Sequence, residues 1–281
     1  MIKVVTDSTA YLPQDLIEQH DIRVVPLNVL FGPKNYSEGV DIGYDQFYRM
    51  LAEADDLPTT SQPAAGDFVT IYSELVEAGH EIISIHISSG ISGTVDSALA
   101  ARNMLPDPDR VSVVDSLSAS IGLELIVRTA LDAIDAGRSR GEIVTLLEQL
   151  SRQLRIYFVV DTLEYLHKGG RIGGASALLG TMLQFKPILF LKDGKIEPFG
   201  KVRTKRKAVA RLLDIVEERV AGQPIGMIGV THALVPDEAE TLVEQLRQRL
   251  GCSECHVSQT GPVIGTHTGP GLLGVAVYTA N

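Results

Sequence analysis

Four short segments rich in hydroxyl side chains and glycine have the composition of a ligand site. They are residues 6–9, 58–63, 88–94 and 265–271. Hydroxyls and the N–H groups at helix N-termini stabilise anions such as a carboxylate or phosphate. Arg171 and His267 stand in glycine-rich surroundings and add charge-assisted donors. Each segment alone is typical of a cap or turn, but together they predict an anion site.

A second chemistry open to the same residues is acyl hydrolysis. Ser92 lies between a predicted strand and a predicted helix, where hydrolases of the α/β class carry their nucleophile. With His267 as base and Asp7 to orient it, Ser92 would attack an acyl carbonyl. The surrounding order is G-x-S-G-T rather than G-x-S-x-G, which counts against this alternative.

Other motifs that suggest cofactors or metals are incomplete. The glycines of residues 169–174 do not form G-x-G-x-x-G, and no G-x-x-x-x-G-K-[ST] loop is present. Residues 252–256 match the C-x-x-C-H pattern of haem attachment, but the start of the chain lacks the apolar core of an export signal. We therefore expect structural thiols, no metal and no cofactor.

The elements that must position these segments alternate between strands and helices. Apolar runs predict strands at residues 2–6, 22–30, 81–87, 111–115, 155–160, 225–231 and 272–278. Amphipathic segments predict helices at residues 45–54, 67–78, 93–105, 117–136, 140–153, 205–221 and 237–250. This alternation predicts an α/β fold, and ligands of such folds bind beyond the carboxyl ends of the strands.

One hairpin signal indicates a second domain. Asp193 and Gly194 separate two short apolar runs within residues 187–196, and an antiparallel hairpin fits poorly in a doubly wound parallel sheet. We expect an N-terminal parallel-sheet α/β domain over residues 1–155. A C-terminal mixed-sheet α/β domain is expected over residues 156–281.

Composition narrows the class of protein. The chain has 281 residues, a formal net charge of −10 and only 5% aromatic residues. An acidic balance without a basic stripe argues against a nucleic-acid binder, and no run reaches the ~18 apolar residues of a membrane span. We expect a cytoplasmic protein. The basic segment from Lys201 to Lys207 is either a solvated helix start or a docking patch for an anionic lipid or a partner.

Taken in order, five motifs resemble the DegV family. They are the segments at residues 6–8, 60–63, 88–94, 166–172 and 265–271, which span nearly the whole chain. The resemblance implies a two-domain fold that binds one long-chain, palmitate-like fatty acid between its domains. It also implies relatedness to the acyl-carrying B subunit of bacterial fatty acid kinase, in which a separate ATP-dependent subunit phosphorylates the bound acid. The protein would then be a carrier rather than an enzyme.

The resemblance also implies roles for individual residues. Thr60 and Ser92 match the hydroxyls that hold the carboxylate, and His267 and Arg171 match the basic pair beside it. Further neighbours of the head group would be Ser61, Gly93 and Thr94. The helix expected at residues 175–185 has an apolar face that would either line the tunnel or belong to the ordinary core, made by Leu178, Leu179 and Met182.

Overall fold

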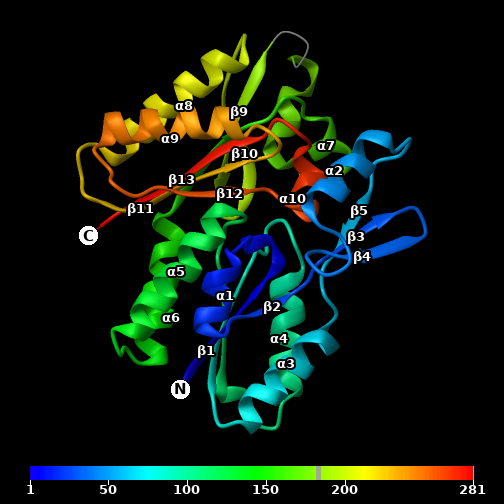
Figure 1. The fold of residues 1–281 in the computed structure, drawn as a ribbon, viewed down its shortest axis with the longest axis vertical. Coiled ribbons are helices and arrows are strands. Elements are labelled where there is room, and N and C mark those ends of the chain that lie inside the picture. The colour runs from blue at the N-terminus through cyan, green and yellow to red at the C-terminus, as the bar shows by residue number, and fades with distance from the viewer. Residues whose placement is uncertain (182–184, 281) are drawn as a thin grey trace.

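The computed structural model describes residues 1–181 and 185–280, and its strands form two large sheets and one small sheet (Figure 1). The first large sheet is entirely parallel, in the order β2-β1-β6-β7. Its strands are β1 (Ile2–Asp7), β2 (Arg23–Val25), β6 (Glu81–His86) and β7 (Val111–Asp115). The strand order reverses between β1 and β6, so the loops after these two strands open at the switch point where ligands of such sheets bind.

Alternating side chains of the parallel sheet bury two separate cores. Val4 and Ile83 face α5 (Ile121–Asp135) and α6 (Arg140–Gln153), whereas Val5 and Ile82 face α3 (Ala65–Glu77) and α4 (Thr94–Met104). Because neighbouring strand residues point to opposite faces, a sheet covered on both sides needs apolar residues at every position. The Val/Ile-rich runs of the sequence meet this requirement.

The second large sheet is mixed, with the order β10-β9-β8-β13-β11-β12. All its neighbouring pairs are antiparallel except β11 with β12. Its strands are β8 (Arg155–Val159), β9 (Lys186–Lys192), β10 (Lys195–Val202), β11 (Ile225–His232), β12 (His256–Gln259) and β13 (Leu273–Thr279). The expected hairpin is confirmed: Asp193 and Gly194 both have positive φ, as a two-residue hairpin turn requires.

The two sheets are joined through helix α5. On one side α5 packs on β1 and β6, and on the other it packs on β11 and β13. The apolar cluster around α5 therefore includes Ile85 of the first sheet together with Ile156 and Ala276 of the second. The far face of the second sheet is covered by α8 (Lys205–Val220) and α9 (Pro236–Leu250).

The small sheet belongs to the N-terminal half but packs on the C-terminal half. It contains β3 (Asn28–Phe31), β4 (Lys34–Ser37) and β5 (Thr59–Ser61), and it lies with α2 (Tyr44–Glu53) against α10 (Pro262–Thr268). The single strand expected at residues 22–30 is wrong, because Pro26 separates β2 from β3 and each joins a different sheet. The division at residue 155 stays a proposal.

The remaining elements are short. They are the helices α1 (Gln14–His20) and α7 (Glu164–Lys168) and the 3₁₀ helices η1 (Ser8–Ala10), η2 (Pro108–Arg110) and η3 (Gly173–Thr181). The helix expected from residue 117 begins only at Ile121, since Leu117 and Ser120 both have positive φ. Within the described ranges, no helix has the length and apolar character that crossing a membrane requires.

Candidate functional site

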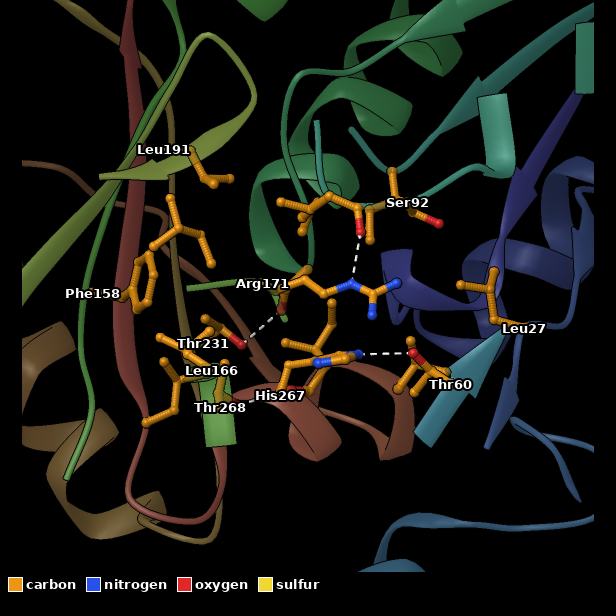
Figure 2. Close-up of a pocket in the computed structure, with 18 of the residues that line it drawn as sticks. Leu27, Thr60, Ser92, Phe158, Leu166, Arg171, Leu191, Thr231, His267 and Thr268 are labelled. Carbon is orange, nitrogen blue, oxygen red and sulfur yellow. Dashed lines mark hydrogen bonds between the residues drawn. The ribbon is translucent and has the colours of Figure 1, made fainter. Parts of the chain in front are cut away.

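A cavity lies between the two large sheets, closed on one side by β5 and α10 (Figure 2). The centre of a water molecule could occupy a volume of about 80 Å³ within this cavity. Most of its wall is aliphatic or aromatic, supplied by both halves of the chain: Leu27, Ile87, Ile91, Ala119, Ile156, Phe158, Leu166, Leu191, Ile196, Val263, Ile264 and Leu272. An apolar wall with a few polar groups is typical of a site for a small, largely hydrophobic molecule.

Thr60 and His267 form the hydrogen-bonded pair of the cavity. Thr60 lies on β5 and His267 in the last turn of α10, and their Oγ1 and Nε2 atoms are 2.7 Å apart. The other ring nitrogen, Nδ1, is buried without a partner among the described residues and faces Gly169 so closely that a Cβ there would collide with it. A buried N–H without an acceptor is rarer than an unpaired acceptor, so we assign the proton to Nε2. His267 then donates to Thr60, and the Thr60 hydroxyl is left to donate into the cavity.

The His267 ring is neutral. Burial lowers its pKa to about 4, and the nearby Arg171 guanidinium acts in the same direction. Burial disfavours the charged imidazolium, and a cation beside it adds repulsion. His267 therefore supports the Thr60 hydroxyl as a neutral donor, while the positive charge of the site comes from Arg171.

Arg171 is fixed by main-chain carbonyl groups. Its Nε donates to the carbonyl of Ile91 at 3.2 Å, and one terminal nitrogen donates to the carbonyl of Gly169 at 2.9 Å. No carboxylate of the described chain lies within ion-pair distance of this half-buried guanidinium. A partly desolvated cation without an acidic neighbour attracts an anionic ligand. Figure 2 shows the guanidinium between the Ser92 segment and the ring of His267.

Ser92 reaches the cavity from the loop before α4. Its Oγ is 2.8 Å from the Thr94 Oγ1. Gly93 is the N-cap residue of α4, and a Cβ there would lie 2.8 Å from the Gln62 side-chain nitrogen, so glycine permits the β5 segment to pass close by. Ser61, like Gln62, lines the cavity and is exposed, whereas Gly93 does not line the cavity. The polar end of the cavity is therefore its solvent-facing end.

Asp7 and Ser88 hold the loops rather than facing the cavity. Asp7 is fully buried and accepts from Ile87 N–H at 2.9 Å, with His86 Nδ1 at 3.1 Å from the same carboxylate oxygen. The Ser88 hydroxyl donates to the carbonyl of Gly194 at 2.8 Å, which docks the β9–β10 hairpin on the first domain. These two residues fix the switch-point loops in place.

A buried carboxylate positions the helix that carries His267. Glu38, only 4% exposed, accepts from Ser8 and Tyr11 of the first domain and from the Val263 N–H in the first turn of α10. Burial raises the pKa of Glu38 to about 7, against the lowering effect of these three donors. Glu38 thus connects the loop after β1 with the start of α10.

The family model described as "Uncharacterised protein, DegV family" matches residues 1–280. The chain belongs to the DegV family. It is 43% identical over 278 residues to a DegV domain-containing protein of Streptomyces coelicolor, with 98% of each chain covered. A DegV family protein from Thermus thermophilus, described for its fatty acid binding, superposes with a TM-score of 0.93 at 38% identity. DegV of Bacillus subtilis, described as a fatty acid binding protein, gives 0.89 at 39% identity, and each comparison covers 99% of both chains.

The expected two-domain DegV fold is confirmed, and the fold brings the predicted head-group residues of this DegV chain to one cavity. Thr60, Ser92, Arg171 and His267 all line it. The segment at residues 265–271 is not a loop as expected, because it contributes helix α10. The Ser92–His267–Asp7 triad of the hydrolase alternative is not assembled, since each of these side chains is bonded to another residue.

Two further expectations concern residues outside the predicted head-group site. Leu178 and Leu179 pack on the apolar cluster that contains Leu163 and Leu189, and they do not line the cavity. Met182 lies outside the described residues. Both thiols, Cys252 and Cys255, are free. No cluster of side chains that could hold a metal ion occurs in the described part of the chain.

Sequence reasoning missed Glu38 and a row of hydroxyls deeper in the DegV cavity. Ser120 Oγ lies 3.0 Å from Thr231 Oγ1, which lies 3.0 Å from Thr260 Oγ1. These three residues come from the N-cap of α5, from β11 and from the segment after β12, so no local pattern connects them. A polar residue in an otherwise apolar strand was the one available signal, at Thr231.

Proposed function

We propose that this protein binds one long-chain fatty acid in its interdomain cavity, in the cytoplasm. The observation that carries the proposal is Arg171, a half-buried cation at the polar end of an apolar cavity, with no acidic partner among the described residues. The carboxylate would lie beside Arg171 and accept from the Thr60 and Ser92 hydroxyls. The fatty acid binding described for the proteins from Thermus thermophilus and Bacillus subtilis supports the same ligand class.

The apolar wall would supply most of the affinity. A C16 chain buries ~14 methylenes at ~0.8 kcal/mol each, which is roughly 11 kcal/mol before association costs are subtracted. Each neutral hydrogen bond at the head group contributes only ~1 kcal/mol. The polar residues therefore determine which end of the acid lies at Arg171.

Mass spectrometry of the molecules released from denatured protein tests this proposal directly. Protein purified from a bacterial host should carry a C14–C18 fatty acid at near-stoichiometric amounts. Leu191→Trp, which places a larger ring in the cavity wall, should reduce the bound lipid while circular dichroism remains unchanged. A nucleotide, a polar metabolite or equal lipid loading of both proteins would contradict the proposal.

We further propose that the protein acts as the carrier subunit of a fatty acid kinase and has no catalytic chemistry of its own. The exposed Ser61 and Gln62 at the polar end support this role, because a partner can approach the carboxylate there. An acyl phosphate carries more negative charge than a carboxylate, so Arg171 should matter more for the product than for the acid. Arg171→Gln should lower phosphoryl transfer by a cognate kinase more than acid binding, and equal losses would contradict the role.

Transient contact with an anionic membrane is the remaining part of the proposal. In the segment from Lys201 to Lys207, Lys205 is paired with Asp161 and Glu238, whereas Arg203, Arg206 and Lys207 are exposed. A local basic patch attracts anionic lipid, and a net charge of −10 opposes lasting attachment. Vesicles of 30% phosphatidylserine should bind the protein weakly at low salt. An Arg203→Glu, Lys207→Glu variant should lose this binding, and equal sedimentation of both proteins would argue for a merely solvated helix start.

A further inference from the structure

The row of three hydroxyls lies in the wall of the acyl cavity, away from the head-group residues. Ser120 and Thr231 line the cavity, whereas Thr260 is fully buried behind them. In Figure 2 Thr231 lies beside Leu166 and Phe158, on the opposite side of Arg171 and His267 from Thr60. A fatty acid held at Thr60 would pass these hydroxyls with its chain.

One of the three hydroxyl protons of this row has no acceptor within the row. Three hydroxyls carry three protons, and the row contains two hydrogen bonds. None of the three oxygens has another partner in the described chain. A spare proton on Thr260 would be buried without an acceptor, whereas on Ser120 it points to the cavity. The favourable direction therefore runs from Thr260 through Thr231 to Ser120, with the last donor available to a ligand.

The backbone of Ser120 supports a role beyond local structure. Ser120 is the N-cap residue of α5, a position at which serine commonly accepts from the helix N–H groups, yet its side chain makes no such bond. Its φ of 52° and ψ of −132° lie in a region that favours glycine, so the backbone of a serine there is strained. This strained conformation places the Ser120 hydroxyl in the row instead of against the N–H groups of the helix.

We propose that the cavity selects fatty acids that carry a hydroxyl or keto oxygen where the chain passes Ser120 and Thr231. The inference rests on the proposed fatty acid binding and specifies its substrate class. An oxygen at that point accepts the spare donor of Ser120. The same oxygen at any other position along the apolar wall is buried without a partner. The cavity thus distinguishes positional isomers of one oxygenated acid.

A purely structural role for the row makes a different prediction. Ser120 immediately precedes α5 and Thr231 lies on β11, so their bond also connects two packed elements. If that were its whole purpose, breaking it would change the affinity for every fatty acid alike. Recognition of a chain oxygen would instead change only the affinities of the oxygenated acids.

The test measures binding of delipidated protein to stearic acid and to octadecanoic acids hydroxylated at successive positions, by isothermal calorimetry. One or two adjacent isomers should bind about 10-fold more tightly than the other isomers. Ser120→Ala should remove this preference and leave stearic acid within about 3-fold of wild type. Thr231→Val keeps the Ser120 donor but removes the hydroxyl that orients it, so it should only weaken the preference. Thr129→Val is the matched control, because Thr129 is also on α5 but bonds to Leu125 and Tyr278 outside the cavity.

Each outcome separates this inference from the proposed function. Tight stearic acid binding with equal affinities for all isomers overturns the inference and leaves fatty acid binding intact. Equal losses for all acids in Thr231→Val also overturn it, in favour of the structural role. A protein that binds neither stearic acid nor any isomer refutes both. Should Ser120→Ala fail to fold, Ser120→Gly, which suits the positive φ and also removes the hydroxyl, still decides.

Discussion

Replacing Thr60 by valine tests the proposed head-group geometry most directly. Valine keeps the β-branched shape that suits strand β5 and removes only the hydroxyl. In the structure this hydroxyl accepts from His267 Nε2 at 2.7 Å and offers its own proton to the cavity. The variant therefore loses two hydrogen bonds in different states: one in the free protein and one only when a carboxylate is bound.

The expected magnitudes follow from these two bonds. His267 is only 8% exposed, so its N–H would lose its acceptor in a buried place, which destabilises the free protein by about 1–3 kcal/mol. A hydrogen bond to a charged acceptor contributes ~1.5–3 kcal/mol, so palmitate affinity should fall roughly 10- to 100-fold. Hexadecanol, which has no charge, should lose less than palmitate.

Isothermal calorimetry on delipidated protein measures the affinities, and thermal unfolding without ligand measures the stability. Thr60→Ser is the matched control, because it keeps the hydroxyl and should bind palmitate within a few-fold of wild type. If Thr60→Val and Thr60→Ser bind palmitate equally well, the carboxylate does not lie at Thr60. In that case the assignment of the polar end would have to be abandoned.

Three other predictions, made with variants of Gly169 and Glu38, address the surroundings of the site. Gly169→Ala should displace His267, which a Cβ there would strike, and weaken fatty acid binding at least about 5-fold in calorimetry. Gly43→Ala is the control, because Gly43 lies at an open position and its replacement should leave the affinity unchanged. Burial raises the pKa of Glu38 from 4.5 to about 7, so its contribution to the free energy of unfolding is complete below pH 4.5 and is lost as the pH rises through 7. Glu38→Gln should remove up to roughly 3 kcal/mol of this decline in stability, measured by denaturant titrations. The affinity of Glu38→Gln for a fatty acid should be constant from pH 6 to 8, because His267, with a pKa of about 4, is neutral throughout this range. A steady loss of affinity as the pH rises would indicate an imidazolium at His267.

Much of the fold follows from local patterns. Residues 111–115 and 140–153 were predicted with the bounds that the structure shows, since each is a regular run flanked by turn residues. The head-group residues followed from hydroxyl-rich and glycine-rich segments beyond predicted strands, together with the family resemblance. Thr60, Ser92, Arg171 and His267 could therefore be named before their geometry was known.

The missed features depend on contacts between distant residues. Helix α10 contains Gly265 and two threonines, which are poor helix formers, and its first turn is held by Glu38 from the other end of the chain. Its helical state is therefore a product of tertiary structure. The hydroxyl row is equally non-local, because Ser120 and Thr231 are 111 positions apart. No periodicity within a window of ~18 residues reports such a pairing.

Helix α5 has a consequence for how the protein unfolds and exchanges its ligand. The helix shares one continuous apolar core with both large sheets, from Ile85 through Leu123 to Ile156 and Ala276. Separating the two halves like a hinge would expose this core, so denaturation should follow one cooperative transition instead of two. Under the proposed function, a fatty acid would then enter by local displacement of edge elements such as β5 or the β9–β10 hairpin. Its exchange rate should follow hydrogen-exchange protection in those elements rather than global stability.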